Sequence, residues 1–307
     1  MAGVTLRSFR SGDERAFLEL WNATYHRDPI TLEQFVRQTL LDPNFLAQGC
    51  ILAERGGRPL GFALAVAPGV QHLFGQPPRV GRLTGLGVQP EARGMGIAQR
   101  LLKAALAFLK KNNCDKVGVA AHEYYVAGLD KEAYADGISF LNSQGFVTSS
   151  YQAVAMGCSL YELKRPLQVV ESEKRFKKDR ITASFYKPEM AWAVVEFFRK
   201  EFPTWTEFFV KQLDQGNDPD DIVLAWHGEK VIGYCQRLAA DHVGPFGVAE
   251  AYRGRGIGTV MLYRLLDRMR AKGYRFAWFG ETGRAQNYYE RAGFKLKRTY
   301  AILSKSI

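Results

Sequence analysis

The feature that most restricts the fold of this chain is an internal repeat. The hexapeptide Arg93-Gly94-Met95-Gly96-Ile97-Ala98 recurs as Arg253-Gly254-Arg255-Gly256-Ile257-Gly258, 160 residues later. Three further pairs of similar segments keep the same order in both halves: 17–25 and 194–202, 52–62 and 224–234, and 142–146 and 290–294. Repetition at such a long period indicates a duplicated domain. The changing offsets predict that the first half carries two additional loops, near 67–80 and 121–135.

The repeat divides the 307 residues into two domains, as their number also suggests. We predict a first domain over 1–163, a linker over 164–179 and a second domain over 180–307. The linker is rich in basic side chains, which are typical of a solvated connection: Lys164, Arg165, Lys174, Arg175, Lys177 and Lys178. The hydrophobic share of 47% is sufficient for a buried core in each domain.

Hydrophobic periodicity predicts the same series of elements in each domain. In the second half we expect a strand, two helices and a hairpin, at 180–186, 188–202, 206–215 and 222–238. A strand, a helix, a strand, a helix and a final strand region follow, at 242–248, 257–271, 274–281, 284–293 and 294–305. This order is typical of an α/β (α+β) fold, with a mixed central sheet flanked by helices in each domain.

The glycine hexapeptides stand between a central strand and the next helix. Glycine allows backbone N–H groups to approach an anion closely, and the N-terminus of a helix carries partial positive charge. A single such stretch would also be consistent with a simple tight turn from strand to helix. Two copies at matching places in a repeat favour a phosphate-binding turn.

With these elements in place, the chain resembles the GNAT superfamily of acetyl-CoA-dependent N-acyltransferases, in a two-domain form. Both hexapeptides fit the family pattern R/Q-x-x-G-x-G/A that follows the fourth strand. The segment Tyr289–Phe294 fits a second family pattern, a helix that ends Y-E-x-x-G-F. The resemblance covers nearly the whole sequence and implies acetyl-CoA as co-substrate.

The resemblance also implies which residues bind coenzyme A. Backbone amides of the glycine turns would hold the pyrophosphate, and the strand before each turn would pair with the pantetheine arm. In the second half these residues are Phe246, Gly247, Val248, Arg253, Gly254, Arg255, Gly256, Ile257 and Gly258. In the first half they are Leu86, Gly87, Val88, Arg93, Gly94, Met95, Gly96, Ile97 and Ala98. Thr282 stands where the family commonly has a cofactor-binding asparagine.

The two halves differ at the position of the general acid. Five residues before the phenylalanine of the G-F pair, the second half has Tyr289 and the first half has Leu141. A phenol can donate a proton to a leaving thiolate and leucine cannot. We therefore predict that the second domain is catalytic and that the first is a non-catalytic domain, unless Tyr124, Tyr125 or Tyr134 replaces the missing phenol. Whether the first domain binds acetyl-CoA stays open at this point.

The general base is less clear from the sequence. Glu281 at the end of the fifth strand is our candidate, with Asp241 and His242 at the start of the fourth as alternatives. Each could act directly or through water. A surface or capping role is the competing interpretation of all three residues.

The favoured function is transfer of acetyl from acetyl-CoA to the primary amine of a small molecule. The chain is similar to bacterial glucosaminide N-acetyltransferases, so an amino sugar is a candidate acceptor. The alternatives are a non-catalytic acetyl-CoA sensor or interaction module, and a peptide or protein N-acetyltransferase.

Composition excludes some other classes. The four cysteines and five histidines lack metal-ligand spacing, so we expect no metal. The absence of a long apolar run or a signal-peptide pattern predicts a cytoplasmic protein without a membrane partner. The net charge of +11 suits a phosphate-rich cofactor, and no motif indicates a nucleic-acid partner. We expect a monomer or homodimer.

Overall fold

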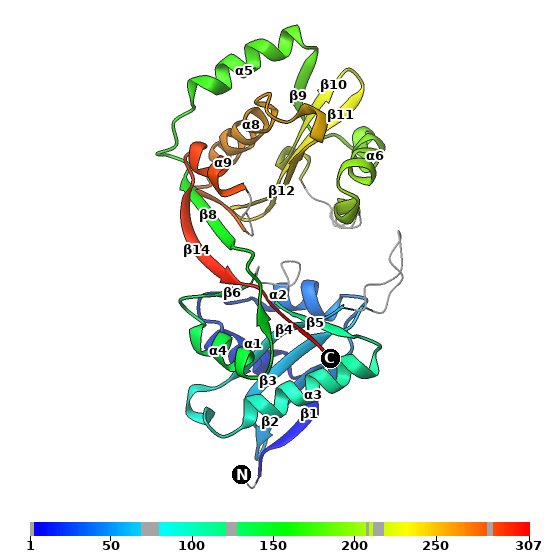
Figure 1. Cartoon of the computed structure of the whole chain (residues 1–307), viewed down its shortest axis with the longest axis vertical. Coiled ribbons are helices and arrows are strands. Elements are labelled where there is room, and N and C mark those ends of the chain that lie inside the picture. Colours follow the sequence, from blue (N-terminus) through cyan, green and yellow to red (C-terminus); the bar gives the residue numbers. More distant parts are fainter. Residues whose placement is uncertain (1–2, 69–79, 121–127, 207–208, 211–217, 281–284) are drawn as a thin grey trace. The chain divides into compact units, whose positions relative to one another are not determined.

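A computed structural model describes residues 3–68, 80–120, 128–206, 209–210, 218–280 and 285–307. The chain forms two compact units (Figure 1). The first comprises Met1–Ala153 together with Thr299–Ile307, and the second comprises Val154–Arg298. Each unit has a mixed sheet flanked by helices, which confirms the expected fold class. Among the described residues, no helix has the length and apolar character that crossing a membrane requires.

The first unit is built on a seven-stranded sheet in the order β1-β2-β3-β4-β5-β15-β7. Strands β4 and β5 are parallel, and the other paired strands are antiparallel. The strands are β1 (Thr5–Ser8), β2 (Cys50–Arg55), β3 (Arg58–Val66), β4 (Val80–Val88), β5 (Lys116–Val119), β7 (Val147–Thr148) and β15 (Leu303–Ser306). The helices are α1 (Glu14–Thr24), α2 (Leu32–Phe35), α3 (Ile97–Lys111) and α4 (Ala135–Ser143), and a π-helix (Val36–Leu40) follows α2.

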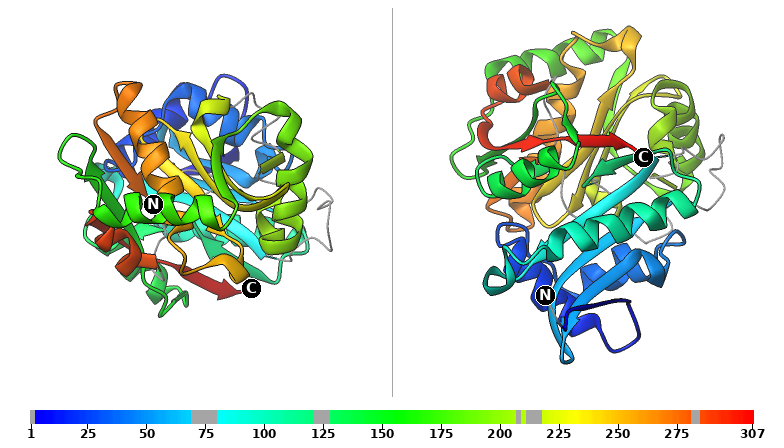
Figure 2. Two further views of the ribbon diagram at one scale, coloured as in Figure 1. Left: turned by 90° about the horizontal axis from the view of Figure 1, so that it is seen from above. Right: turned by 60° about the horizontal axis from the view of Figure 1, so that its bottom comes forward.

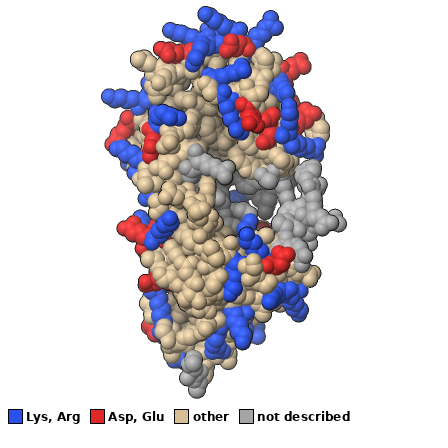
Figure 3. Space-filling model, viewed as in Figure 1, with Lys and Arg blue, Asp and Glu red and all other residues tan. Residues whose placement is uncertain are grey.

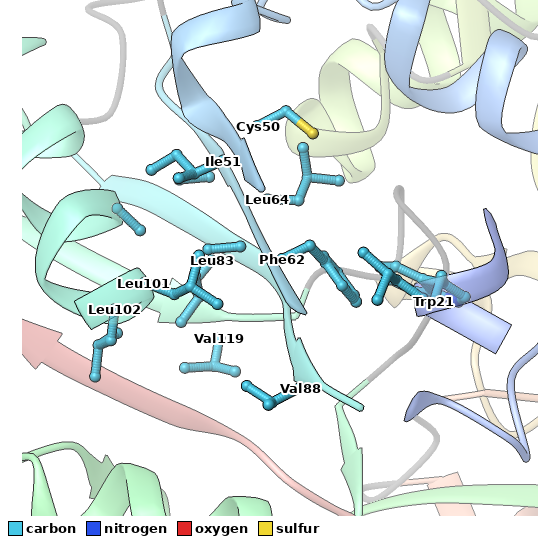
Figure 4. Close-up of a cluster of buried hydrophobic side chains, with 14 of the residues drawn as sticks. Trp21, Cys50, Ile51, Phe62, Leu64, Leu83, Val88, Leu101, Leu102 and Val119 are labelled. Atoms are coloured by element: carbon cyan, nitrogen blue, oxygen red, sulfur yellow. The ribbon is translucent and has the colours of Figure 1, made fainter. Parts of the chain in front are cut away.

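The core of the first unit forms where apolar faces of α1 and α3 pack on the sheet. Trp21 and Phe17 of α1 contact Phe62 of β3, with ring centroids 5.6 and 4.9 Å apart. On α3, Leu101 and Leu102 are fully or almost fully buried (Figure 4). The apolar residues of α3 recur at helical spacing, which explains why one face of this helix is buried.

The second unit repeats this plan. An eight-stranded sheet has the order β6-β14-β8-β13-β12-β11-β10-β9, and only β12 and β13 are parallel among the pairs whose register is defined. The strands of this sheet are β6 (Leu129–Asp130), β8 (Ala153–Ser159), β9 (Ile181–Phe185), β10 (Ile222–His227), β11 (Lys230–Ala239), β12 (His242–Val248), β13 (Phe276–Phe279) and β14 (Lys295–Ala301). The residues of β6 and the last residues of β14 fall within the first unit. The helices are α5 (Leu167–Lys178), α6 (Ala191–Glu201), α8 (Ile257–Ala271) and α9 (Gln286–Arg291).

Helices cover both faces of the sheet in the second unit. The views in Figure 2 show its strands with α8 on one side and α6 on the other. One core cluster packs α8 against the sheet around Met261 and Leu265, and another packs α6 around Phe198 and Tyr234. The predicted hairpin is present as β10 and β11, and the predicted helix at 188–202 begins with a short 3₁₀ turn before α6. Most of the predicted helix at 206–215 lies outside the described residues.

The unit boundaries differ from the contiguous domains 1–163 and 180–307 that the repeat suggested. Strand β8 belongs to the first repeat in sequence but pairs with β13 of the second unit, where Met156 lies opposite Phe279. Strand β15 closes the chain but pairs with β5 of the first unit, where Ser304 lies opposite Gly118. The last strand of each repeat thus completes the sheet of the other unit.

The segment 164–179, which the sequence predicts to be a solvated linker, is largely helical. Most of it is the helix α5, which belongs to the second unit. Val169, Ser172 and Phe176 are buried, while the basic residues between them are exposed. These three residues recur at intervals of three and four, so they share one face of the helix. The run of charge in the sequence concealed this narrow buried stripe.

Candidate active site

The two glycine turns have nearly the same backbone. The φ angles are +75° and +69° at Gly94 and Gly96, and +76° and +82° at Gly254 and Gly256. Glycine adopts this region without steric cost, whereas other residues adopt it rarely. A Cβ on Gly94 or Gly254 would meet no atom within 4 Å, so space lies beside each turn. Both turns therefore leave the backbone open to a ligand.

A 15-residue helix begins directly after each turn. Gly96 and Gly256 are the N-cap residues of α3 and α8, and since glycine has no side chain, neither N-cap residue caps the first amides of its helix. The first N–H groups of a helix have no partner within the helix and carry partial positive charge. The mouth of each helix can thus bind an anion such as a pyrophosphate.

The arginines of the motif are held by the protein backbone. The Nε atoms of Arg93 and Arg253 donate to the carbonyl oxygens of Val88 and Val248, at 3.3 and 3.1 Å. Arg255 lies over the ring of Tyr252, 5.3 Å from its centroid. The motif arginines therefore fix the turn to the preceding strand.

In the second unit, helix α5 brings a further cationic side chain to the turn. A Cβ on Gly256 would collide with Ser172 and would lie 3.9 Å from Nη2 of Arg175. Arg175 donates to the Ser172 hydroxyl at 3.1 Å, and no carboxylate forms an ion pair with it among the described residues. Figure 3 shows Lys and Arg side chains gathered over α5. The sequence analysis placed this residue in a linker and did not identify it as part of the site.

The parallel pair of central strands separates in the direction of each turn. In the first unit β4 and β5 pair from Val80 to Leu83, and in the second β12 and β13 pair at His242 and Trp278. The segments 86–88 and 246–248 lie beyond these pairs, on strand edges that no parallel neighbour covers in the described structure. A ligand chain can pair with such an edge through main-chain hydrogen bonds.

Tyr289 lies on α9 against the two separating strands. Its ring centroid is 4.2 Å from Phe279 of β13 and 6.3 Å from Phe246 of β12, and the residue is 4% exposed. Burial raises the pKa of its phenol well above the ordinary value, so the hydroxyl keeps its proton. The corresponding residue of the first unit, Leu141 on α4, is buried without any polar group.

Tyr288 is a second phenol at this place that sequence reasoning missed. Its hydroxyl is buried, has no partner that meets full hydrogen-bond geometry among the described residues, although Thr259 is close enough to influence its pKa, and lies 3.5 Å from the position of a Cβ on Gly258, at the first turn of α8. Burial raises its pKa, and the nearby Thr259 hydroxyl opposes this rise. A buried polar atom without a partner is costly, so it indicates a group that a ligand can satisfy. Nothing in the spacing of the sequence separates Tyr288 from other tyrosines on amphipathic helices.

The alternative bases have structural roles in the second unit. Asp241 accepts a hydrogen bond from the indole Nε1 of Trp278 at 2.9 Å, and its carbonyl accepts from the Trp278 amide. His242 is stacked on the same indole, with centroids 4.0 Å apart. Glu281 and Thr282 lie outside the described residues, as do Tyr124 and Tyr125 of the first half.

Tyr134, the third possible replacement for the missing phenol, has a carboxylate as its hydrogen-bond acceptor. It lies directly before α4 in the first unit and donates to the Asp28 carboxylate at 2.7 Å.

Among the residues that the structure describes, no group of three or more His, Cys, Asp or Glu side chains could hold a metal ion. The described chemistry of the site is therefore that of amides, phenols and guanidinium groups.

Comparison with known proteins identifies the family. The model of the acetyltransferase (GNAT) family matches residues 8–128 and 187–294, which covers both repeats. The mycothiol acetyltransferase of Sanguibacter keddieii is 35% identical over 130 residues, 41% of this chain and 39% of that protein. This match spans about two-fifths of the length of that relative.

Solved structures share the fold over almost the whole chain. One is the GCN5-related glucosamine N-acetyltransferase region of a fungal multi-domain GH3 beta-N-acetylglucosaminidase (TM-score 0.83, 18% identity, 99% of this chain and 38% of that one). Another is a GCN5-related N-acetyltransferase from Sphaerobacter thermophilus (TM-score 0.72, 19% identity, 99% and 95% of the two chains). With two family domains matched in tandem and two such sheets in the structure, the chain belongs to the acetyltransferase (GNAT) family.

Proposed function

We propose that the protein is an acetyl-CoA-dependent N-acetyltransferase that acetylates the primary amine of a small molecule, and that the second unit is the catalytic one. The observation that carries this proposal is the packing of Tyr289 against both Phe246 of β12 and Phe279 of β13. The first unit has the same glycine turn but a leucine in place of this phenol. Family membership supports the class of reaction.

The residues of the second unit fit acetyl-CoA. The open space beside Gly254, the uncapped amides of α8 and the unsatisfied Tyr288 hydroxyl each offer room or a hydrogen bond to a ligand. The turn 253–258 would hold the pyrophosphate, the edge 246–248 would pair with the pantetheine arm, and Thr282 would supply a hydroxyl. Acetyl-CoA, when bound, supplies the acetyl group activated as a thioester.

Tyr289 acts as the general acid in this proposal. The amine nitrogen would attack the thioester carbonyl, the carbon–sulfur bond would break, the leaving sulfur would take the Tyr289 proton, and the nitrogen would lose a proton to Glu281 directly or through water, after which solvent would reprotonate Tyr289. A thiol has an ordinary pKa of about 8.5 and a phenol about 10, so the transfer is uphill in water. Burial raises the pKa of both kinds of group, as it does for the buried thiol of Cys235 in the same core. The pKa values of the leaving thiol and of the Tyr289 phenol therefore shift in the same direction if the sulfur is also buried.

Glu281 is the proposed base. It follows β13 in the sequence, and the alternative residues Asp241 and His242 are engaged with Trp278. An amine with a pKa near 7.8 costs only about 1 kcal/mol to deprotonate at pH 7, at 1.36 kcal/mol for each pKa unit. Such an amine needs a weak base or a water molecule at most. A weak base at this site is thus sufficient for an acceptor amine that is less basic than a simple alkylamine.

An amino sugar is the proposed acceptor. A solved structure with the same fold carries a glucosamine N-acetyltransferase region, although the low identity supports the fold alone. The test follows thiol release from acetyl-CoA with glucosamine, a simple alkylamine and a peptide with a free N-terminus. Turnover that is largest with glucosamine supports the proposal, and preference for the peptide favours the protein acetyltransferase. Binding of acetyl-CoA without turnover of any amine favours the sensor module.

A further inference from the structure

The strand edge that the pantetheine arm would use has its outward amide bonded to a side chain in the first unit, whereas no described side chain bonds to the matching amide in the second. We infer that Tyr25 closes this edge in the first unit, whereas its counterpart Phe202 leaves it available, so that the chain binds one acetyl-CoA, in the second unit. The inference rests on the proposed function and deepens it, because it assigns the residue that decides which repeat takes the cofactor.

Hydrogen bonding along β4 shows which amides face away from its antiparallel neighbour. The N–H of Gln89 donates to the Leu60 carbonyl at 2.8 Å, and antiparallel pairs alternate between bonded and non-bonded residues. The amide of Leu86 therefore points away from β3, toward the side where β4 has separated from β5. It donates there to the Tyr25 hydroxyl at 3.1 Å, and the same hydroxyl is 3.5 Å from the Leu86 carbonyl oxygen.

Tyr25 is held firmly in this position. It is the C-cap residue of α1, and its own amide donates to the Trp21 carbonyl at 2.7 Å. Its ring stacks on Trp21 with centroids 4.5 Å apart and meets Tyr134 edge-on at 5.3 Å. The residue is 5% exposed, and burial raises its pKa to about 12, so the hydroxyl stays neutral. A ligand that paired with the edge at Leu86 would have to displace this buried phenol.

The second unit has the same amide without the phenol. Ala249 donates to the Ile232 carbonyl at 2.9 Å, so by the same alternation the amide of Phe246 points away from β11. Phe202 is the C-cap residue of α6 and matches Tyr25 in the repeat, but it has no hydroxyl. Its ring stacks on Trp205 at 4.6 Å and packs against Gly247. Among the described residues, no side chain forms a hydrogen bond with the Phe246 amide.

The glycine turns cannot make this distinction, because their backbones are nearly the same in the two units. At this strand edge the two units differ in one oxygen atom. It is the hydroxyl of Tyr25 at the end of α1, which Phe202 at the end of α6 lacks. Tyr25 thereby acts as a specificity-determining residue for the cofactor, although it belongs to the unit that lacks the catalytic phenol.

The test titrates acetyl-CoA into the full chain by isothermal calorimetry and counts bound molecules by native mass spectrometry. We expect one equivalent. The matched variants Gly254→Asp and Gly94→Asp place a carboxylate at the two turns, where a Cβ would meet no atom within 4 Å and where the nearly equal positive φ angles make the backbone strain of the two variants comparable. Gly254→Asp should abolish binding, and Gly94→Asp should leave the stoichiometry and Kd unchanged. Circular dichroism checks that both variants are folded.

Tyr25→Phe removes the hydroxyl and keeps the ring, so it tests the closing group itself. We expect a second equivalent of acetyl-CoA to bind, at least tenfold more weakly than the first, and Gly94→Asp in the same chain should remove it. Two equivalents in the wild type, or one equivalent in Tyr25→Phe, would overturn the inference. No binding by the wild type would instead refute the proposed function together with it.

Discussion

The two glycine turns are alike in their backbone, while the groups around them differ. Both turns lead into a helix of 15 residues, and both keep their first amides free of side-chain caps. Yet Tyr289 corresponds to Leu141 in the repeat and Phe202 corresponds to Tyr25, and Arg175 of α5 lies beside the turn of the second unit. This difference indicates that the glycine turn belongs to the fold, whereas function depends on the side chains that surround it.

The units also differ in how their sheets are completed. The strand between β13 and β14 in the second unit is β8, from the first repeat, and the strand between β5 and β7 in the first unit is β15, from the end of the chain. Each unit therefore needs residues from the other half of the sequence. Four predictions test this comparison, and they run from the largest expected effect to the smallest.

Truncation of a buried side chain in an exchanged strand should destabilise the unit that receives the strand. Leu303 in β15 is 1% exposed and Met156 in β8 is 0% exposed. We expect Leu303→Ala to lower the stability of the first unit, and Met156→Ala that of the second, by about 2–5 kcal/mol each. Hydrogen exchange read by mass spectrometry should show faster exchange in β5 for the first variant and in β13 for the second. The opposite assignment would contradict the exchange of strands.

Loss of the phenol should reduce turnover much more than cofactor binding. We expect Tyr289→Phe to lower kcat by about 10²-fold or more, since general acids contribute about 10²–10⁴-fold. The KM for acetyl-CoA should stay within about threefold, because binding is assigned to other groups. The matched control is Leu141→Met in the first unit, which should leave kcat unchanged in steady-state assays of thiol release. An equal loss in both variants would argue against a single catalytic unit.

Removal of the guanidinium beside the second turn should weaken the cofactor. We expect Arg175→Ala to raise the Kd of acetyl-CoA about tenfold, as a hydrogen bond to a charged group contributes about 1.5–3 kcal/mol and 1.4 kcal/mol corresponds to tenfold. Lys178→Ala, on the same helix, is the control. Calorimetry with 3′-dephospho-CoA identifies the phosphate that Arg175 contacts. If Arg175→Ala leaves the Kd of this ligand unchanged, the contact is with the 3′-phosphate. If Arg175→Ala weakens this ligand as much as acetyl-CoA, the contact is with the pyrophosphate. No loss with either ligand would exclude Arg175 from the site.

The pH profile should show one ionisation on the acid side and none on the alkaline side below about pH 10. The pKa of Tyr289 is raised by burial, so the phenol remains protonated above its ordinary range. The value of kcat/KM should therefore rise through the pKa of the acceptor amine and then stay level. A fall with an apparent pKa of 8–9 would indicate a different acid.

The duplication, the two glycine turns and the difference between Tyr289 and Leu141 could all be predicted from the sequence. These features are local: a positive φ needs glycine at that position, a helix needs its apolar face at regular spacing, and a phenol either occupies a position or does not. The same reasoning located the hairpin and the helix α8, whose boundaries agree with the prediction.

The tertiary structure alone decided which distant segments meet. Nothing in the spacing of the chain shows that Tyr25 bonds to an amide 61 residues away, that Asp241 and His242 are engaged with Trp278, or that β8 and β15 exchange sheets. Periodicity defines the face of a strand or helix that is buried, but it does not determine the choice of the strand or side chain that bonds to a given strand edge. That choice depends on how well whole surfaces pack and on which backbone groups remain to be satisfied.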